Sequence, residues 1–403
     1  MSSVNFLEKL LDGVPVEWKH LGDEKYFEIA NSGRKPVKAS LRESGSIPYY
    51  GANNIQDYVK GYTHDGDYVL VAEDGSASLE NYSIQHARGK FWANNHVHVL
   101  CGKDCVNTRF LFHYLSIVKF IPYLTGGVRA KLTKGSLVEI QVPIPCPDNP
   151  KKSLEIQAEI VRILDAMTAH TAELTAELTA ELTARKKQYD YYRDKLLSFE
   201  EDVYEFPLSD ICTSIADGDH QAPPQTSTGI NFVTISNISK NGFIDFSKTK
   251  YVPDDYYKNL ASKRKPRFGD VLYTVVGSIG IPVFIDFEKE FTFQRHVAIL
   301  RFKTELVNPK YVFHFMRSRI FFNKANSVAM GAAQKTITLG TLGKLKISLP
   351  SLERQNNIVA ILDKFDSLAN SITDGLPREI ELREKQYAYY RDLLLSFPAA
   401  QAA

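Results

Sequence analysis

The sequence lacks the motifs of enzymes that act on nucleotides or nucleic acids. It contains no GxxxxGK[ST] phosphate-binding loop and no [ND]PP[YF] tetrapeptide of the kind that amino-methyltransferases use. A PD…[DE]xK nuclease pattern is incomplete, because Leu272 stands where a lysine would have to follow Asp270. Serine, histidine and aspartate are scattered without a recognisable nucleophile elbow. We therefore expect no catalytic residues in this chain.

Cysteine and long apolar runs are also scarce. The four cysteines are irregularly spaced and do not form a disulfide framework, which predicts a reducing, cytoplasmic location. The uncharged and mostly apolar run VLYTVVGSIGIPVFI (271–285) has 15 residues with two glycines and a proline, so it predicts strands and is too short to cross a membrane. The first residues, MSSVNFLEKLLDG, lack the pattern of a signal peptide. We expect no membrane partner.

Charge is distributed unevenly along the 403 residues, a length that predicts two domains plus connecting elements. The net charge of +2 is weak support for a nucleic-acid partner. Residues 301–347 hold nine Lys or Arg and one acid, whereas residues 153–203 hold eleven acids and six bases. Basic charge thus lies in the expected domains and acidic charge on the connecting segment. Ordinary solvated surface remains the alternative for each basic patch, so charge alone does not settle the partner.

An internal duplication is the strongest feature of the sequence. SLEIQAEIVRILDAM (153–167) matches SLERQNNIVAILDKF (351–365), and QYDYYRDKLLSF (188–199) matches QYAYYRDLLLSF (386–397), both at an offset of 198. Residues 126–145 resemble 331–350, and NNHVHVL (94–100) resembles QRHVAIL (294–300), whereas 25–65 and 212–265 share almost nothing. One unit is written twice, which predicts a domain at 1–150, a helical spacer at 151–203, a domain at 204–350 and a helical spacer at 351–403.

The beginning of the chain resembles the junction between the two copies. KLLDGVPVEWKHLGD (9–23) is similar to KLLSFEEDVYEFPLSD (195–210), which leads from the first spacer into the second domain. The two repeats therefore form an opened ring, and we expect the C-terminal helix to end near the N-terminus.

Both spacers show the apolar periodicity of amphipathic helices. Neither helix could bury its apolar stripe alone, so we predict that the two helices pack as an antiparallel pair. Packing against a partner protein is the competing possibility, and both can hold. DGLP (374–377) should break or kink the second helix. The residues expected to bind a partner are Ile156, Ile160, Ile163, Leu174, Leu178, Leu182, Ile358, Ile361 and Phe365. The predicted fold is α+β, with two globular domains separated by two long helices in an antiparallel coiled coil and a pseudo-twofold internal repeat.

The first spacer contains three perfect tetrapeptides, TAELTAELTAEL (171–182). Four residues add roughly 6 Å of helix and advance its phase by about 40°. DNA turns by about 35° per base pair. One tetrapeptide would therefore rotate one domain by about one base-pair step. A replication-slippage scar in a tolerant helix is an alternative that is compatible with this role.

The segment HVHVLCGKDC (96–105) holds the metal-ligand types His96, His98, Cys101 and Cys105 at zinc-like spacings. The other interpretation is a strand with alternating faces followed by a turn. The second copy has His296, Ala298, Arg301 and Glu305 at the corresponding positions, so the set is absent there. We favour no metal site.

Polar residues suited to reading nucleic acid remain. Asn and Gln can bond adenine, Arg and Lys can bond guanine, and Lys, Arg, Ser and Thr contact the backbone. For each residue, an ordinary surface or capping role is the alternative. The first-domain candidates for DNA contact are Arg34, Lys35, Asn53, Asn54, Gln56, Arg88, Asn94, Asn95, Arg129 and Lys131. The second-domain candidates are His220, Gln221, Asn237, Lys263, Arg264, Arg267, Gln294, Arg295, Gln334 and Lys335.

Over essentially its whole length the chain resembles the specificity subunit of a type I restriction–modification system. The domain end GAAQKTITLGTLGKLKISLPSLERQNNIVAILD (331–363) is the most specific part, and QVPIPCPDNPKKSLEIQAEIVRILD (141–165) matches less regularly. The family's E-Q helix start is met by Glu155-Ile156-Gln157 and Glu353-Arg354-Gln355, and GDVLYTVVGSIG (269–280) fits its GD-strand-Gly pattern. GDYVLVAEDGS (66–76) lacks the second Gly, and Gly127-Val128-Arg129 replaces Ala332-Ala333-Gln334, so the first domain departs more.

This resemblance implies two target-recognition domains that each read one half of a bipartite, asymmetric site in double-stranded DNA. It also implies that the helices dock two modification (methyltransferase) subunits and that restriction subunits join them in an ATP-dependent nuclease. S-adenosylmethionine, ATP and Mg²⁺ would bind those partners and not this chain. The competing class is a stand-alone architectural or regulatory DNA-binding protein. An enzyme that acts alone is the least favoured reading.

Overall fold

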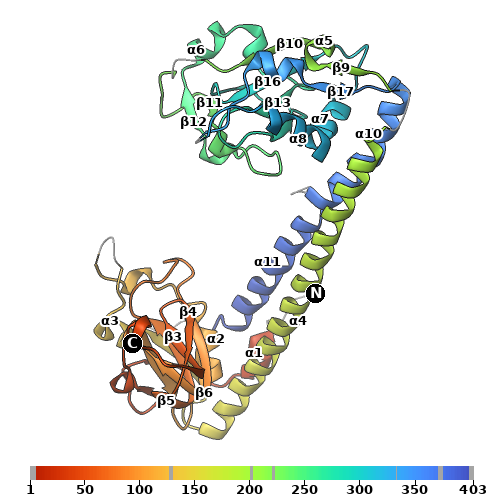
Figure 1. Cartoon of the computed structure of the whole chain (residues 1–403). Helices are drawn as coiled ribbons and strands as arrows, with labels where there is room; N and C mark the ends of the chain where they lie inside the picture. Colours follow the sequence, from red (N-terminus) through yellow and green to blue (C-terminus); the bar gives the residue numbers. More distant parts are fainter. Residues whose placement is uncertain are drawn as a thin grey trace. The chain divides into compact units, whose positions relative to one another are not determined.

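The computed structural model describes residues 6–126, 130–199, 203–219, 223–332, 334–370 and 375–398. The chain forms two compact units, Met1–Thr175 with Leu382–Ala403, and Ala176–Glu381. Each unit combines β-sheet with helices, which confirms the predicted α+β class (Figure 1). Within the described residues, none of the helices combines the length and the apolarity that crossing a membrane requires.

A mixed six-stranded sheet forms the centre of the first unit, in the order β2-β7-β5-β6-β3-β4. β7 pairs antiparallel with β2 and β5, and β3 lies parallel to β6. A separate ladder joins β1 to β8. The bounds are β1 (Val16–His20), β2 (Phe27–Ile29), β3 (Ser44–Gly51), β4 (Asn54–Val59), β5 (His64–Ala72), β6 (Ile84–Ala93), β7 (Val97–Gly102) and β8 (Gln141–Pro145).

The second unit repeats this topology in two pieces, β10-β16-β13-β14 and β12-β11-β15. β11 lies parallel to β15 as β3 does to β6, so β14 and β15 together replace the single strand β6. β9 pairs with β17 as β1 does with β8. The bounds are β9 (Glu205–Pro207), β10 (Cys212–Asp217), β11 (Ile230–Val233), β12 (Lys250–Val252), β13 (Val271–Thr274), β14 (Pro282–Phe284), β15 (Phe291–Phe293), β16 (Val297–Phe302) and β17 (Lys346–Ser348).

Two details of these strands bear on the sequence predictions. The uncharged run 271–285 forms β13 and β14, as predicted. β7 alternates its faces as predicted, with Val97 and Val99 in one apolar cluster and Leu100 in another, but both faces are buried, so Val97, His98, Val99 and Leu100 are all buried. The strand lies inside the sheet, between β2 and β5, and apolar clusters cover both of its faces.

Short helices connect the strands in both units. α2 begins after Asn107, whose Oδ1 accepts hydrogen bonds from the backbone N–H groups of Arg109 and Phe110, and Asn308 caps α7 by accepting from the backbone N–H of Lys310. The α-helices are α1 (Phe6–Leu11), α2 (Thr108–Leu115), α3 (Lys134–Val138), α5 (Leu208–Ile211), α6 (Asp254–Asn259), α7 (Pro309–Arg317), α8 (Arg319–Val328) and α9 (Leu339–Lys344). The 3₁₀ turns are η1 (Asn31–Gly33), η2 (Ala39–Leu41), η3 (Ile121–Tyr123), η4 (Ile235–Asn237), η5 (Phe246–Lys248) and η6 (Ser262–Arg264).

The spacers are helical as predicted. α4 (Pro150–Leu196) has 47 residues and starts at a proline, a residue that the first helical turn tolerates. The second spacer forms α10 (Leu352–Asn370) and α11 (Leu376–Leu394). Gly375 lies outside both helices, and its carbonyl accepts the Arg378 N–H at 2.9 Å, so the predicted interruption at DGLP is confirmed.

The spacer helices pair within each unit. In the first unit, the Thr168 hydroxyl of α4 and the Tyr387 hydroxyl of α11 are 2.8 Å apart. In the second unit, the ring of Tyr192 on α4 stacks on that of Phe365 on α10, with centroids 5.4 Å apart. Later residues of α4 thus meet earlier residues of the second spacer, which confirms the antiparallel pairing.

The last described residues lie against the beginning of the chain in the first unit. The indole Nε1 of Trp18 donates to the Pro398 carbonyl at 2.9 Å. Leu7 and Leu11 of α1 share a buried cluster with Leu394 and Phe397. The predicted proximity of the N-terminal region and the C-terminal helix is confirmed.

Candidate nucleic-acid interface

Three loops meet at one edge of the first unit, and we call residues 73–76, 94–96 and 125–131 the first loop edge. The Glu73 N–H donates to the His96 carbonyl at 2.8 Å, and the Leu132 N–H donates to the Glu73 carbonyl at 2.7 Å. Thr125 and Lys131 exchange backbone bonds of 2.9 and 2.7 Å, which close the third loop into a hairpin; its residues 127–129 lie outside the described residues. Backbone hydrogen bonds thus hold the three loops together.

The second unit builds the same edge from residues 275–278, 294–296 and 330–336, the second loop edge. The Val275 N–H donates to the His296 carbonyl at 2.9 Å, and the Ile337 N–H donates to the Val275 carbonyl at 2.9 Å. Met330 and Thr336 exchange backbone bonds of 2.9 and 2.8 Å. The loop edges therefore have equivalent backbones, although they differ in most side chains.

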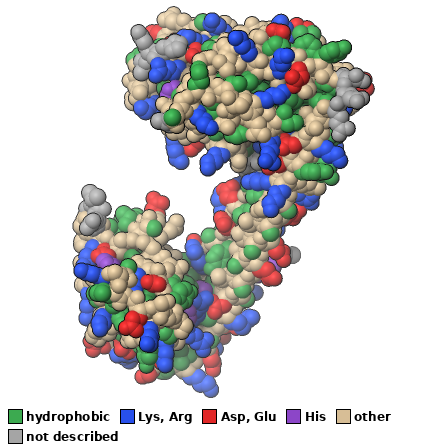
Figure 2. All heavy atoms as spheres, viewed as in Figure 1, with side chains coloured by type: hydrophobic (Ala, Val, Ile, Leu, Met, Phe, Trp, Pro, Cys, Tyr) green, Lys and Arg blue, Asp and Glu red, His purple; other side chains and the backbone are tan. Residues whose placement is uncertain are grey.

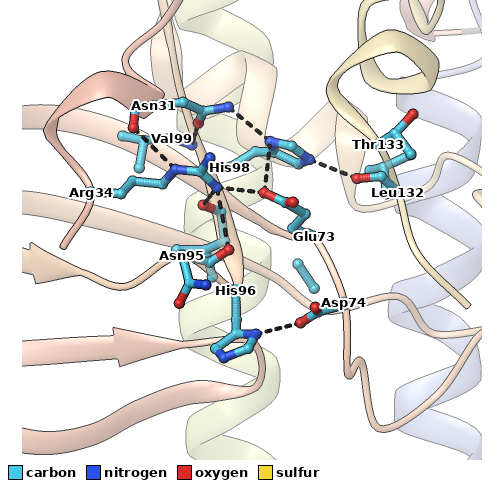
Figure 3. A network of polar contacts seen from close by, with 12 residues as sticks. Asn31, Arg34, Glu73, Asp74, Asn95, His96, His98, Val99, Leu132 and Thr133 are labelled. Atoms are coloured by element: carbon cyan, nitrogen blue, oxygen red, sulfur yellow. Dashed lines mark hydrogen bonds and ion pairs between the residues drawn. The ribbon is translucent and has the colours of Figure 1, made fainter. Parts of the chain in front are cut away.

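A network of buried charge supports the first loop edge (Figure 3). Arg34 donates through Nη1 to Glu73 Oε2 at 2.6 Å and to the Val97 carbonyl at 2.8 Å, and Lys131 Nζ lies 2.9 Å from Glu73 Oε1. Burial raises the pKa of Glu73, but the hydrogen bonds from Arg34 and Lys131 outweigh it and hold that pKa below its ordinary value. Glu73 is Val275 in the second copy, so this network belongs to the first unit.

His98 belongs to the same network and has both ring nitrogens engaged. Asn31 Nδ2 donates to Nδ1 at 2.9 Å, so Nε2 carries the proton and donates to the Leu132 carbonyl at 2.8 Å. Burial lowers the pKa of His98, in agreement with a neutral ring. Among the described residues, no three His, Cys, Asp or Glu side chains are placed to hold a metal ion. His98 is a structural residue.

The candidates for DNA contact in the first unit divide into two groups. Several serve the fold: Arg34 is in the buried network, the Asn53 amide bonds the Gly75 carbonyl and the Ala77 N–H at 2.7 Å each, and the Asn94 Oδ1 accepts the His96 N–H at 2.8 Å. Asn54 begins β4 directly after the turn, with φ of 125°. Asn53 and Asn54 are exposed as well, and the other exposed candidates are Lys35, Gln56, Arg88, Asn95 and Lys131, the last of which is paired with Glu73. Arg129 lies outside the described residues.

The second-unit candidates divide similarly. Asn237 is buried and caps η4, Arg264 pairs with Asp219, Arg267 donates to the Ser262 hydroxyl, and Lys335 Nζ donates to Asn326 Oδ1 at 2.6 Å. Lys263, Arg295 and Gln334 are exposed, and Gln294 contacts the His296 ring. His220 and Gln221 lie outside the described residues. The loop edges bring together Asn94, Asn95 and Lys131 in one unit and Gln294, Arg295, Gln334 and Lys335 in the other.

A basic and aromatic pocket of about 520 Å³ opens on the first unit near η2. The stacked rings of Tyr49 and Trp92 line it, and the Arg42 guanidinium lies 4.1 Å from the Tyr49 centroid. Lys35, Lys38 and Lys60 surround it. The strand register places Phe232 and Thr292 at the positions of Tyr49 and Trp92 in the second unit. The pocket thus lies in the stretch where the two copies diverge.

Each unit is joined to its spacer helix by a buried glutamine. Gln157 Oε1 of α4 accepts the Asn107 N–H at 2.8 Å, and its Nε2 donates to the Cys105 carbonyl at 2.9 Å. Gln355 Oε1 of α10 accepts the Asn308 N–H at 2.8 Å, and its Nε2 donates to the Leu306 carbonyl at 3.4 Å. Both glutamines are fully buried. These are the glutamines of the repeated E-Q helix start, so the repeat itself points to them.

A histidine–aspartate pair completes each joint. His113 Nε2 lies 2.7 Å from Asp165 Oδ1, and His314 Nε2 lies 2.8 Å from Asp363 Oδ1. Burial lowers the pKa of both histidines, and this outweighs the bonds to the aspartates. Burial raises the pKa of both aspartates, but their hydrogen bonds outweigh it and keep them ionised. The candidate residues for function did not include these pairs, although the similar segments FLFHYL (110–115) and YVFHFM (311–316) repeat the histidine.

The helix residues expected to bind a partner have unequal exposure. Ile156, Ile160 and Ile358 are buried inside their own units, so the prediction that they face a partner is corrected: α4 and α10 begin against the domain cores. Ile163 and Phe365 pack partly against those cores, and Leu174, Leu178 and Leu182 are half-buried on α4. Ile361 is exposed. Acidic and basic side chains alternate with apolar ones on the visible helical surface (Figure 2).

A repeated pair of exposed tyrosines lies on the spacer helices. Tyr191 and Tyr192 of α4 correspond to Tyr389 and Tyr390 of α11, and within each pair the rings meet edge to face, with centroids 5.3 and 5.4 Å apart. Tyr191 is 59% and Tyr389 65% exposed. The apolar periodicity that was used to predict contact residues does not detect them.

Comparison with known proteins identifies the family to which the chain belongs. The model of the type I restriction modification DNA specificity domain matches residues 15–184 and again 200–382. The chain belongs to the type I restriction–modification specificity subunits. A Haemophilus influenzae relative described as a type I restriction enzyme specificity subunit is 47% identical and covers 97% of this chain and 98% of its own. The Escherichia coli EcoR124I/EcoR124II specificity subunit is 35% identical and covers 99% and 98%.

The fold of this specificity subunit also matches a solved structure. A chain from a study of assembly and conformational transition of the type I restriction–modification system aligns with a TM-score of 0.60 at 16% identity, over 95% of this chain and 98% of that chain. At this identity the match concerns the fold. The two domain matches fall on the two internal copies, so both loop edges belong to DNA specificity domains.

Proposed function

We propose that this specificity subunit reads a bipartite, asymmetric site in double-stranded DNA, with one half-site per domain and no catalytic role of its own. The main support is the contrast between equal frameworks and unequal side chains. Both loop edges have the same backbone hydrogen bonds, but Glu73 and Lys131 in the first correspond to Val275 and Thr336 in the second. Base readout depends on side chains, so two such edges suit two different half-sites.

The repeated joints and tyrosines support equivalent docking of two modification (methyltransferase) subunits. Tyr191-Tyr192 and Tyr389-Tyr390 are 198 residues apart in matching sequence, and exposed tyrosines are frequent anchors of protein interfaces. In the cytoplasm, restriction subunits join this complex, and S-adenosylmethionine, ATP and Mg²⁺ bind to the partners. Copurification provides the test. A complex with two larger subunits is expected, whereas a lone stable dimer would favour a stand-alone architectural or regulatory DNA-binding protein.

Sequencing of methylated bases in cells that carry the whole system tests the site. We expect two unlike half-sites whose centres lie about one helical turn, 34–36 Å, apart. A 47-residue helix reaches at most about 70 Å, so this separation is attainable. A continuous or palindromic motif would contradict the proposal.

The tetrapeptides of α4 are proposed to set the spacer between the half-sites. Deleting residues 179–182 removes one TAEL repeat, about 6 Å and 40° of helix. The spacer of the methylated motif should change by about one base pair and both half-sites should stay the same. If the bases of a half-site changed instead, the helix would not act as a ruler.

A further inference from the structure

One histidine occupies the same place in both loop edges. His96 and His296 are each the last residue of the turn before a central strand, β7 or β16, and their carbonyls accept the equivalent bonds from Glu73 and Val275. The His96 side chain is 48% exposed, and that of His296 is half-buried. Apart from the backbone bonds, this histidine is one of the few features that the two loop edges share. A side-chain role common to both domains is therefore best sought here.

The two rings are held by partners of opposite hydrogen-bonding character. His96 Nδ1 lies 2.5 Å from Asp74 Oδ1, and because a carboxylate accepts, that nitrogen carries a proton. His296 Nδ1 lies 2.9 Å from Gln294 Nε2, and because an amide NH₂ only donates, that nitrogen carries a lone pair. In the neutral rings, Nε2 is therefore an acceptor in His96 and a donor in His296. Within the described residues, neither Nε2 has a hydrogen-bond partner.

The surroundings keep these rings at the surface. Figure 3 shows the His96 ring apart from the buried Arg34–Glu73–His98 cluster, with Nδ1 turned to Asp74. Asn95 and Arg295, the preceding residues, are exposed in the same turns. A ring fixed at Nδ1 and open at Nε2 is prepared to make one directed contact with little further loss of rotamer freedom.

We propose that His96 and His296 each read one base pair of their half-sites through Nε2, with opposite polarity. His96 accepts from the exocyclic amino group of adenine or cytosine, and His296 donates to a purine N7 or to guanine O6. Asp74 and Gln294 are positioning residues that select the ring tautomer. This inference rests on the proposed function. It adds that the same residue type, histidine, reads a base in both domains, and that the residue bonded to its Nδ1 decides which base it prefers.

Single substitutions in the complete complex test the contact. With His96→Ala, methylation should become degenerate at one base pair of one half-site, and with His296→Ala at one base pair of the other, each with a loss of discrimination of about tenfold. His20→Ala is the matched control, because His20 is another exposed histidine of the first unit, on β1. Unchanged melting temperatures show that the variants are folded. Discrimination that is retained at every base pair, or lost equally at all of them, overturns the inference.

Substitution of the positioning residues tests the polarity. Gln294→Glu replaces a donor by an acceptor at His296 Nδ1, so Nε2 should turn from donor to acceptor and the preferred base at that one position should change. Asp74→Asn should alter the preference at the His96 position alone. A uniform loss of affinity without a changed preference would overturn the assignment of polarity. If the native complex methylates no two-part motif, the proposed function fails; if it does and these variants change no base preference, the inference alone fails.

Discussion

Gln157 and Gln355 make the same bonds to the chain before α2 and α7, whereas the loop edges share their backbone bonds but few of their side chains. The joints are therefore built alike, whereas the side chains of the loop edges are not. The difference extends into the sheets. The second unit buries Asp270 against Arg301, at 2.7 Å, but the strand registers place Tyr68 and Cys101 at these positions in the first. This pattern would result from selection for equivalent docking of partner subunits at the two joints and for different base readout by the two domains.

The largest expected effect concerns the buried pair of the second unit. Asp270→Ala leaves the Arg301 guanidinium without its bidentate partner, and we expect a loss of about 3 kcal/mol in the free energy of unfolding. Asp67→Ala is the control, because Asp67 is the aspartate of the other GD motif and is 47% exposed, and it should cost under about 1 kcal/mol. Urea denaturation measures both values. Equal losses would contradict the contrast between the two sheets.

The glutamine joints should show equal effects. Gln157→Ala and Gln355→Ala each leave a buried backbone N–H and C=O without partners, at a cost of about 2 kcal/mol. The measurement is the urea midpoint of each variant together with copurification of the modification subunits. Gln188→Ala is the control, because Gln188 of α4 is half-buried and accepts from Arg185 of the same helix at 3.0 Å; it should leave both unchanged within error. If only one of the two glutamine substitutions lowered the urea midpoint, the two joints would not be equivalent.

The smallest expected effect is on acid sensitivity. Burial holds the pKa of His86, His98 and His113 in the first unit below the ordinary 6.5, with His314 as the corresponding residue of the second. As the pH falls through about 6.5, these histidines become protonated in the unfolded chain before they do in the folded protein. The free energy of unfolding therefore decreases between about pH 6.5 and the lower pKa of the folded state, by up to about 1.4 kcal/mol per unit of pKa shift.

The first unit should accordingly lose more stability than the second between pH 7 and pH 5. Both tryptophans, Trp18 and Trp92, lie in the first unit, so their fluorescence follows it, while circular dichroism follows both units. His20→Ala should not alter the difference. A fluorescence midpoint that is less sensitive to acid than the dichroism midpoint would reverse this comparison.

Much of the architecture could be predicted from the repeat. Periodicity predicted the spacer helices, the DGLP segment predicted the break before α11, and the similarity of residues 9–23 to 195–210 predicted contact between the two ends of the chain. The candidate DNA contacts were less predictable. Arg34, Asn53, Asn94 and Asn237 have the chemistry of base readers but satisfy polar groups of their own fold, and composition does not distinguish the two uses.

The amino-acid sequence was enough to predict that the chain contains one unit twice, that long helices join the copies and that the copies differ most at 25–65 and 212–265, because these properties depend on local periodicity and on comparison of the copies. Which residues meet became clear from the three-dimensional fold. It showed that stretches with almost no shared sequence adopt one strand order, because sheet topology depends on the apolar pattern of the strands rather than on their identities. It also placed Asp74 and Gln294 against equivalent histidines, a pairing that depends on loop closure across the sheet and leaves no local signal in the sequence.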